Sequence, residues 1–587
     1  MQRCGTIFPR RGEGPVKTPV LLLFFFPGIL PAHEILSEET PVIAARDSTD
    51  RYEIFVDCGK VLGPVNRGIF GTNLISVDYN LAENYNLARA DTNKSTPATV
   101  VEKKEPTYAS TDYGAGLWDA DKKKPVKEVI DLLKKVKISS LRYPGGCGAH
   151  LRDWKWAVGP REHYLFGLNE FLEVCSLINA EPVIIVSYFT GDAEDAADMV
   201  RYLNGDPADK IPKGRENWAE KRVKWGHKKP FHVTYFEIGN EVWHGNHTTV
   251  DKVSSNEYGK RYLPYYHTMK SADPAIKIGA IMNEGKWGVG VMKTVGRNLD
   301  FASFHWYPAC NIHFEGEEEV ETFSSMLFFP DIEIRRYLSD IYTNLELYCG
   351  KKVPVAFTEV NFGYHQARHP RIGFTLATAL VMAEILREFL LEGDRFLFAN
   401  QWLFVNEFWG MVGNDYWGKP KPGDGLYKPY RKRPIYLLYQ LYADHFGDML
   451  VAASTGTGGP RFQGLRKSKA NEYLRLLNAD TKVPHSPQLA EPYLTTIASL
   501  SKKRDTLFII VNNRGHDSLQ TVIRLKNYIA AGTAATHTLN GSWIGATNEN
   551  GITEVRITDN TAAFESSGAV YTFPPYSVTA LVLPGKS

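Results

Sequence analysis

Two glutamates at the ends of short apolar runs could act together as a pair of carboxylates. Glu241 ends the run that starts at Tyr235, and Glu359 ends the run that starts at Val355. In a (β/α)8 barrel the reactive groups lie where strands end and loops begin, so two glutamates on different strands can converge over one ligand. Paired carboxylates carry out the chemistry of most glycoside hydrolases. The sequence therefore predicts such a pair and a barrel that positions it.

Eight short apolar runs have the length and spacing of barrel strands. Amphipathic stretches separate several of them, among them Val126 to Val136, Leu168 to Ile178 and Gly373 to Leu391. This alternation is typical of a parallel sheet with crossover helices, and it places Glu241 on the fourth strand and Glu359 on the seventh. The expected strands are Arg67 to Leu74, Ile138 to Tyr143, Pro182 to Tyr188, Val233 to Ile238, Lys277 to Met282, Phe301 to Tyr307, Val353 to Glu359 and Phe396 to Phe404.

The chain changes character beyond Tyr436, where β-like runs such as Leu507 to Val511 alternate with turn residues. We expect an all-β sandwich there, and an early strand, Tyr52 to Val56, that could pair into it. The predicted fold class is α/β, a TIM barrel with a C-terminal β-sandwich. The predicted divisions are an export segment and disordered lead at 1–45, a strand that joins the sandwich at 46–66, a catalytic barrel at 67–435 and the sandwich at 436–587. A polar insertion at about 80–124 is expected over the barrel mouth.

Composition and charge exclude several partners. The 68 lysines and arginines balance 66 acidic residues, which gives a net charge of +2 and no electrostatic reason to expect nucleic acid. The basic stretch Lys210 to Lys229 contains Glu216 and Glu220, so we interpret it as a solvated helix and loop. No segment beyond the N-terminus is long and apolar enough to be transmembrane. We therefore expect neither nucleic acid nor a membrane as a partner.

The segment at 17–32 resembles a secretory signal. Its apolar run, Pro19 to Phe26, follows Arg10, Arg11 and Lys17 and is too short to span a bilayer. It predicts a secreted or periplasmic protein, with a disordered or mis-started N-terminus as the alternative. Sequons that matter only in a host that glycosylates lie at Asn93, Asn246 and Asn540.

The sequence offers no metal or cofactor motif. The six cysteines include no CxxC pair and no zinc-type spacing, and they form no disulfide framework. His365 and His369 have helical i, i+4 spacing, but Pro370 and the lack of a glutamate between them favour a loop. We expect no metal and no cofactor.

A series of motifs between residues 130 and 285 carries a family likeness. It comprises Leu141 to Gly146, Asp153-Trp154, Val158 to Glu162, Phe166-Gly167, Ala180 to Pro182, Thr190-Gly191, Glu194 to Ala197, Tyr202 to Gly205 and Glu237 to Glu241. In the order of these motifs the chain resembles the α-L-arabinofuranosidases of glycoside hydrolase family 51. Local landmarks continue at Phe304 to Tyr307 and Thr358 to Asn361. The family belongs to clan A, so the resemblance implies a barrel with a β-sandwich and net retention of anomeric configuration.

Two departures from the family pattern fall on contacts to the sugar. Cys147 stands where the family has an asparagine that contacts the sugar, and Ile75 lies near the place of an expected glutamate. The eighth strand, Ala399 to Trp402, only approximates the family pattern. The carboxylate pair is therefore better supported than specificity for arabinofuranose.

The resemblance and the chemistry of retention together assign roles. Glu359 is the expected nucleophile and Glu241 the expected acid/base, and retention requires carboxyl groups about 5 Å apart. Asn240 is by resemblance the donor to the sugar hydroxyl beside the reacting carbon, and Arg142 could hold Glu359 ionised. The further predicted substrate contacts are His305, which could instead orient Glu241, Tyr307, which could donate to Glu359, and Trp306, Gln401 and Trp402.

A purely structural role remains an alternative for some of these residues. A tryptophan such as Trp306 or Trp402 could stack on a sugar, but a barrel also needs bulky aromatic packing. Glu237 lies four positions before Glu241, deeper in the strand, and is left out of the predicted site.

The predicted function is a retaining glycoside hydrolase that acts on oligo- or polysaccharides, most similar to an exo-acting α-L-arabinofuranosidase. The alternatives are the same chemistry with another sugar or an endo mode, such as a β-glucanase or β-xylosidase, and a non-catalytic carbohydrate-binding protein. Hexamers are common among relatives, which leaves a homo-oligomer open.

Overall fold

The computed structural model describes most of the chain between Arg51 and Lys586. The described residues are 51–74, 114–161, 164–245, 252–283, 285–308, 327–362, 372–406, 409–413, 430–456, 458–462, 491–549 and 551–586. The export-like segment lies outside them, as does the expected polar insertion up to residue 113. Within the described helices, none is both long and apolar enough to cross a bilayer.

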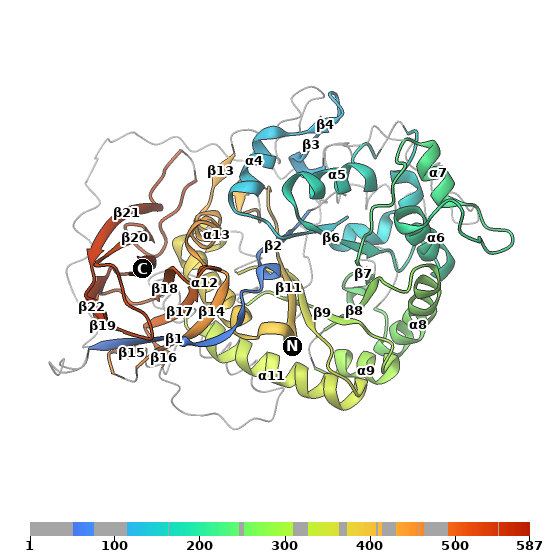
Figure 1. The fold of residues 1–587 in the computed structure, drawn as a ribbon. Helices are drawn as coiled ribbons and strands as arrows, with labels where there is room; N and C mark the ends of the chain where they lie inside the picture. The colour runs from blue at the N-terminus through green and yellow to red at the C-terminus, as the bar shows by residue number, and fades with distance from the viewer. Residues whose placement is uncertain are drawn as a thin grey trace, which may run out of the picture.

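Eight parallel strands close into a barrel, which confirms the predicted architecture (Figure 1). Going round the barrel from the first strand, they are β2 (Gly71–Asn73), β5 (Ser140–Tyr143), β6 (Glu181–Val186), β7 (Tyr235–Ile238), β8 (Lys277–Met282), β9 (Phe301–Trp306), β10 (Val355–Val360) and β11 (Phe396–Gln401). Each of the eight expected runs contains or overlaps one of them. The first run differs in part, because Arg67–Phe70 forms a 3-10 turn before β2 begins.

Helices cover the outside of the barrel, as the alternating pattern predicts. They are α4 (Lys127–Lys135), α5 (Leu168–Ile178), α6 (Ala193–Asn204), α7 (Trp218–Lys224), α8 (Ser255–Ala272), α9 (Lys286–Val295), α11 (Phe329–Cys349), α12 (Leu376–Leu391) and α13 (Pro434–His445). Several begin at capping side chains: Asp192 accepts from the Asp195 amide at α6, and Ser254 accepts from the Glu257 amide at α8. The three expected helical stretches correspond to α4, α5 and α12.

The inside of the barrel has an apolar end and a polar end. Val183, Phe301, Ala356 and Phe398 form a buried cluster against Tyr235, near where the strands begin. Side chains alternate along a strand, so residues two positions on point inward as well. On β9 this order is Phe301, then Ser303, then His305. The polar inward residues thus gather toward the C-terminal ends of the strands.

A nine-stranded sheet forms the second unit, at the opposite side of the molecule in Figure 1 from α6 to α8. Its order is β21-β20-β23-β18-β17-β14-β1-β19-β22, where the strands are β1 (Tyr52–Pro64), β14 (Met449–Thr455), β17 (Leu494–Leu500), β18 (Thr506–Asn513), β19 (Leu519–Lys526), β20 (Thr533–Asn540), β21 (Arg556–Ala563), β22 (Gly568–Phe573) and β23 (Ser577–Pro584). Buried residues of β1, β18, β19 and β23 share one apolar core, so the sheet folds over itself as a sandwich. The early strand pairs with β14 and β19 within it.

Helix α12 joins the barrel to this sheet. It is buried along nearly its whole length, because one side meets the barrel and the other meets β17 and β18. Asn512 donates to the carbonyl of Leu380, and Thr495 donates to the buried carboxylate of Glu384 at 2.6 Å. Burial raises the pKa of Glu384, but Arg387 and Arg514 outweigh it and hold that pKa at about 2. The interface is therefore packed and is joined by hydrogen bonds from Asn512 and Thr495.

Candidate active site

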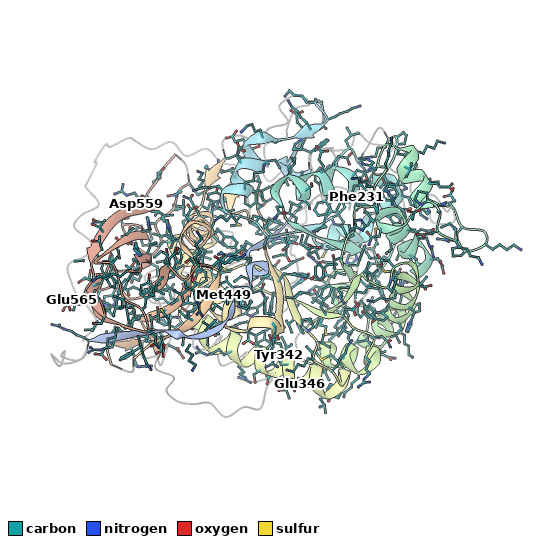
Figure 2. All side chains as sticks on the ribbon, in the orientation of Figure 1. Phe231, Tyr342, Glu346, Met449, Asp559 and Glu565 are labelled. Carbon is teal, nitrogen blue, oxygen red and sulfur yellow. The ribbon has the colours of Figure 1, made fainter. Side chains whose placement is uncertain are left out.

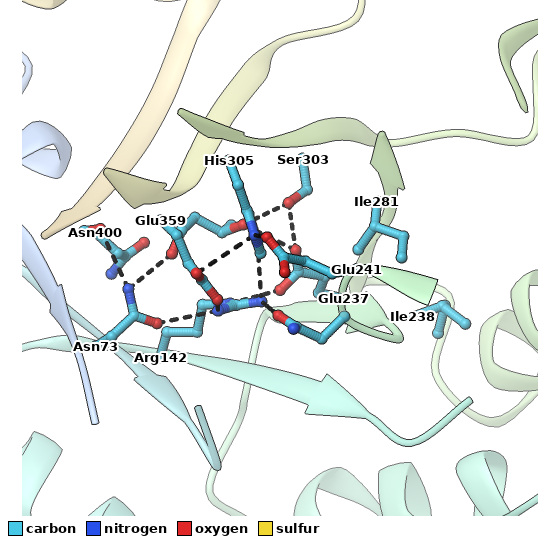
Figure 3. Close-up of polar contacts among 12 residues, drawn as sticks. Asn73, Arg142, Glu237, Ile238, Glu241, Ile281, Ser303, His305, Glu359 and Asn400 are labelled. Carbon is cyan, nitrogen blue, oxygen red and sulfur yellow. Dashed lines mark hydrogen bonds and ion pairs between the residues drawn. The ribbon is translucent and has the colours of Figure 1, made fainter. Parts of the chain in front are cut away.

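Side chains from three barrel strands and the loop after β7 meet at the polar end of the barrel (Figure 3). Arg142 comes from β5, His305 from β9 and Glu359 from β10, while Glu241 follows β7 by three residues. The strands end together because the sheet is parallel, so residues far apart in the chain share one face. The sequence prediction that Glu241 and Glu359 converge is met by this placement.

Arg142 is the fixed centre of the group and is fully buried. Its Nε donates to Glu237 Oε2 at 2.7 Å, and Nη1 donates to Glu359 Oε1 at 2.8 Å. Nη1 also donates to Asn73 Oδ1 at 3.1 Å, and Nη2 donates to Asn240 Oδ1 at 2.7 Å. One planar guanidinium thus holds four acceptors, a task that suits arginine rather than lysine.

Glu237 has the structural role that its depth in the strand suggests. It is fully buried, and both Ser303 and Thr358 donate to its Oε1. The charge of Arg142 compensates the buried carboxylate. Sequence reasoning missed Glu237, Asn73, Ser303 and Thr358 as supporting residues. The inward alternation on β7 and β9 is the signal that could have found Glu237 and Ser303.

The chain around Glu241 turns sharply. Gly239 has a φ of 80° and Glu241 itself a φ of 42°, both in the left-handed region, so the backbone leaves β7 in a tight turn. This turn directs the carboxylate toward His305, whose Nδ1 lies 2.8 Å from Glu241 Oε1. The Glu241 side chain is 19% exposed, against 5% for Glu359. Of the two carboxylates, Glu241 is the one that faces outward.

Glu359 is enclosed by donors. Tyr307 donates to its Oε2, Arg142 donates to its Oε1, and His305 Nδ1 lies 3.4 Å from Oε2. Burial raises the pKa of Glu359 above its usual value and Glu241 adds to the rise, while His305, Arg142 and Tyr307 oppose it. The expectation that Arg142 favours the ionised form is met, but burial outweighs that effect.

The two carboxylates are close enough for double displacement. Ligand atoms of Glu241, His305 and Glu359 all lie within 4.8 Å of one another. Retaining glycosidases place their carboxyl groups about 5 Å apart, whereas inverting ones leave room for a water molecule between them. The same three side chains could also hold a metal ion, but the adjacent guanidinium of Arg142 opposes a cation there. The geometry therefore favours carboxylate chemistry.

Cys147 lies beside the pair, where the family resemblance places an asparagine. Asn240 Nδ2 donates to Cys147 Sγ at 3.2 Å, and Sγ lies 4.0 Å from Glu241 Oε2. Burial raises the pKa of the Cys147 thiol well above its usual value, and the charges of Glu241 and Glu359 add to the rise. The sulfur is therefore an uncharged thiol next to the Asn240 amide.

The two tryptophans predicted to contact substrate lie in different places. Trp306 follows His305 on β9 and so points the other way; it is buried and packs against Phe357 in the core between barrel and helices. It does not reach the carboxylates, which corrects its assignment as a substrate contact. Trp402 is also buried, but its ring lies against the backbone of Gly146, where an added Cβ would approach within 2.6 Å.

Gln401 is buried at the end of β11. Its backbone carbonyl accepts from Thr72, and among the described residues its side-chain Oε1 has no hydrogen-bond partner. Both Gln401 and Trp402 therefore line the end of the barrel without joining the Arg142 cluster. Other positions of interest lie outside the described residues: Ile75, His365, His369, Asn93 and Asn246.

The fold and this carboxylate pair define a glycoside hydrolase of the retaining barrel type. Residues 132–319 match the family model described as the alpha-L-arabinofuranosidase 1 domain. The probable alpha-L-arabinofuranosidase C of Aspergillus clavatus is 24% identical over 495 residues, which are 78% of this chain and 87% of that protein. The intracellular exo-alpha-(1->5)-L-arabinofuranosidase 1 of Bacillus subtilis is 23% identical, with 78% of this chain and 90% of that protein covered.

The fold has a counterpart among solved structures. The alpha-L-arabinofuranosidase of Thermotoga maritima, solved as an arabinose complex, matches with a TM-score of 0.67 and 24% identity over 91% of this chain and 100% of that one. The comparisons thus support a glycoside hydrolase that is similar to the arabinofuranosidases of family 51.

Proposed function

We propose that this protein is an exo-acting α-L-arabinofuranosidase that works by double displacement, with Glu359 as nucleophile and Glu241 as acid/base. The observation that carries the proposal is the spacing of these two side chains: one carboxylate oxygen of each lies within 4.8 Å of the other in the barrel mouth. Glu359 is the enclosed member, held by Arg142 and Tyr307. Glu241 is the outward member, which suits proton exchange with a leaving group and with water.

In the first step the ionised Glu359 attacks the anomeric carbon. A bond forms between its oxygen and that carbon, the glycosidic C–O bond breaks, and Glu241 gives its proton to the leaving oxygen. Negative charge leaves Glu359 and appears on Glu241. Asn240, whose Oδ1 is fixed by Arg142, presents its Nδ2–H to the sugar hydroxyl beside the reacting carbon.

In the second step Glu241 takes a proton from water. The water oxygen attacks the anomeric carbon as it loses this proton, the ester bond to Glu359 breaks, and Glu359 regains its charge. Two inversions give net retention. The sugar leaves as the free hemiacetal, and both carboxyl groups return to their starting protonation.

The choice of arabinofuranose rests on the relatives, since those of Aspergillus clavatus and Bacillus subtilis are both named as arabinofuranosidases. Cys147 favours a second candidate, the same chemistry on another sugar such as a glucoside or xyloside. Its sulfur accepts only weakly compared with an amide oxygen and cannot donate as an amide can. One contact expected of the family is thus absent from the sugar pocket.

The deciding experiment is hydrolysis of nitrophenyl α-L-arabinofuranoside, β-D-glucoside and β-D-xyloside by wild type and Glu359→Ala. Glu346→Ala is a matched control, because Glu346 is an exposed glutamate on α11 at the outer edge of the molecule (Figure 2). We expect arabinofuranoside cleavage that Glu359→Ala loses and Glu346→Ala keeps. If only another glycoside is cleaved, the chemistry stands and that sugar replaces arabinofuranose in the proposal. If neither the aryl glycosides nor polysaccharides tested afterwards are cleaved, the result favours a carbohydrate-binding protein.

We also infer export from the signal-like segment at 17–32. Mass spectrometry of protein purified from the native host tests this inference. A mature chain that begins after residue 32 supports export, and a chain that still carries the run contradicts it. The relative in Bacillus subtilis is named intracellular, so export would distinguish this chain from it.

A further inference from the structure

One ring nitrogen of His305 faces both carboxylates. Nδ1 lies 2.8 Å from Glu241 Oε1 and 3.4 Å from Glu359 Oε2, and Figure 3 draws both contacts. A single N–H thus stands between the two groups whose charges change during the reaction. The shorter contact is to Glu241 and the longer one to Glu359.

The contact on the other side of the ring decides where the proton lies. Arg142 Nη2 lies 3.4 Å from His305 Nε2, and guanidinium nitrogens only donate. Nε2 therefore acts as the acceptor, and the proton of the neutral ring is on Nδ1. In the imidazolium Nδ1 carries a proton too, so the donor toward the carboxylates is present in either charge state.

The ring is held in this position from several sides. Its side chain is 4% exposed, and its position on β9 lies opposite Glu359 in the register with β10. Trp243 meets the ring edge-on at 6.1 Å between centroids, and Trp287 packs in turn on Trp243 at 5.3 Å. The ring cannot swing away from the carboxylates without repacking these indoles.

The other donors to Glu359 cannot follow a moving charge. Arg142 is fixed by Glu237, Asn73 and Asn240 as well as by Glu359. Tyr307 donates its hydroxyl to Glu359 Oε2. When Glu359 becomes an ester and Glu241 becomes a carboxylate, the negative charge moves from one side of Nδ1–H to the other.

We propose that His305 is a positioning residue that shares one N–H donor, fixed between Glu359 and Glu241, so that it supports whichever carboxylate is charged. In the free enzyme this donor supports the ionised nucleophile; in the ester intermediate it supports the ionised base. His305 thereby makes both half-reactions easier through the same hydrogen bond. This inference rests on the proposed roles of the two glutamates.

The test is the pH profile of kcat/KM for His305→Leu beside wild type, on whichever aryl glycoside the wild type cleaves. A hydrogen bond to the charged form lowers a carboxyl pKa, so its removal raises both pKa values. We expect the acidic limb, set by Glu359, and the basic limb, set by Glu241, each to move up by about one unit. A histidine that only oriented Glu241 would leave the acidic limb in place.

His305→Asn is the matched variant, because its side-chain amide can present an N–H close to the place of Nδ1. We expect its two limbs to stay nearer to those of wild type than the limbs of His305→Leu. Limbs that do not move in His305→Leu, or a basic limb that moves alone, would overturn the proposal. Circular dichroism and thermal melting identify a variant that does not fold.

A second measurement needs no turnover. Nitrogen-15 spectra of histidine-labelled wild type report which ring nitrogen of His305 carries a proton, with the His305→Asn spectrum giving the assignment. A protonated Nδ1 supports the proposal and a bare Nδ1 overturns it. A wild type that cleaves no glycoside would instead refute the proposed function, so the two failures are distinguishable.

Discussion

Arg142 Nη1 donates to Glu359 Oε1 at 2.8 Å, and both side chains are almost wholly buried. The two residues are separated by more than two hundred positions in the chain, yet the barrel brings the second and seventh strands to one centre. The same guanidinium holds Glu237 and Asn240. A single buried cation therefore sets the position of the proposed nucleophile and of the sugar-binding amide.

Arg142→Lys should lower both activity and stability. An ammonium is a point charge that cannot reach the four acceptors of the guanidinium, and a buried carboxylate left unpaired costs about 3–5 kcal/mol. We expect kcat/KM on an activated aryl glycoside to fall by at least about 100-fold, with a lower melting temperature. Arg222→Lys is the control, because buried Arg222 donates to backbone carbonyls and should affect melting alone. Equal activity loss in both variants would contradict the assignment.

Glu241→Ala should slow poor leaving groups far more than activated ones. A dinitrophenolate leaves without a proton, so the first step survives while the second lacks its base. Azide, which needs no base, should then restore turnover and give a glycosyl azide of retained configuration. With Glu359→Ala, azide should instead give the inverted product. Proton NMR of the glycosyl azides gives their anomeric configuration. An inverted product from Glu241→Ala and a retained one from Glu359→Ala would reverse the two roles.

Tyr307→Phe should move the acidic limb of kcat/KM to higher pH. The Tyr307 hydroxyl donates to Glu359, and this bond lowers the pKa of a carboxyl that burial raises. Without it the ionised nucleophile appears only at higher pH, by about one unit. The pH profile checks this shift. Tyr436→Phe is the control: it removes a buried hydroxyl that donates to the Leu132 carbonyl at 3.1 Å, and the acidic limb of its pH profile should not move.

Cys147→Asn should raise activity on aryl arabinofuranoside. The thiol now accepts from Asn240 beside Glu241, and an amide there would offer a donor and a stronger acceptor to the sugar. One added hydrogen bond in the transition state corresponds to about a tenfold gain in kcat/KM. Cys147→Ser, which keeps the size of the side chain without the amide, should show no such gain. A fall in Cys147→Asn would indicate that the pocket suits another sugar.

His445 should make the protein less stable as the pH falls from about 6.5 to about 4. It stacks on His537 at 3.5 Å between centroids, and burial together with His537 lowers its pKa to about 4. Across this window the unfolded chain binds a proton that the folded chain does not, so stability is complete above the unfolded value and is lost below it. The neighbouring charged groups are Asp444, Asp559 (Figure 2) and Lys135.

Melting temperatures at pH 7 and pH 5 check this prediction. The difference between them should shrink in His445→Gln, since the substituted residue does not titrate. His267→Gln is the control, because His267 is exposed on α8 and its replacement should leave the difference as in wild type. An unchanged difference in His445→Gln would refute the assignment.

Alternation and spacing predicted the strands well because burial imposes them locally. The runs from Lys277 and from Phe301 match β8 and β9 closely, since a strand covered on both faces must be apolar along its length. The same alternation explains why Trp306 is not beside His305 in the site, because neighbouring side chains on β9 point to opposite faces. The depth of Glu237 in its strand keeps it from the barrel mouth and makes it the buried partner of Arg142.

The sequence by itself determined the barrel, the sandwich and the two glutamates at strand ends, because apolar periodicity and motif order are properties of neighbouring residues. Only the tertiary structure decided how those glutamates relate to each other. The donation of Arg142 to Glu359, the position of His305 between both carboxylates and the contact of Cys147 with Asn240 join residues from different strands. Such contacts depend on barrel closure and register, which are set by the packing of the whole chain.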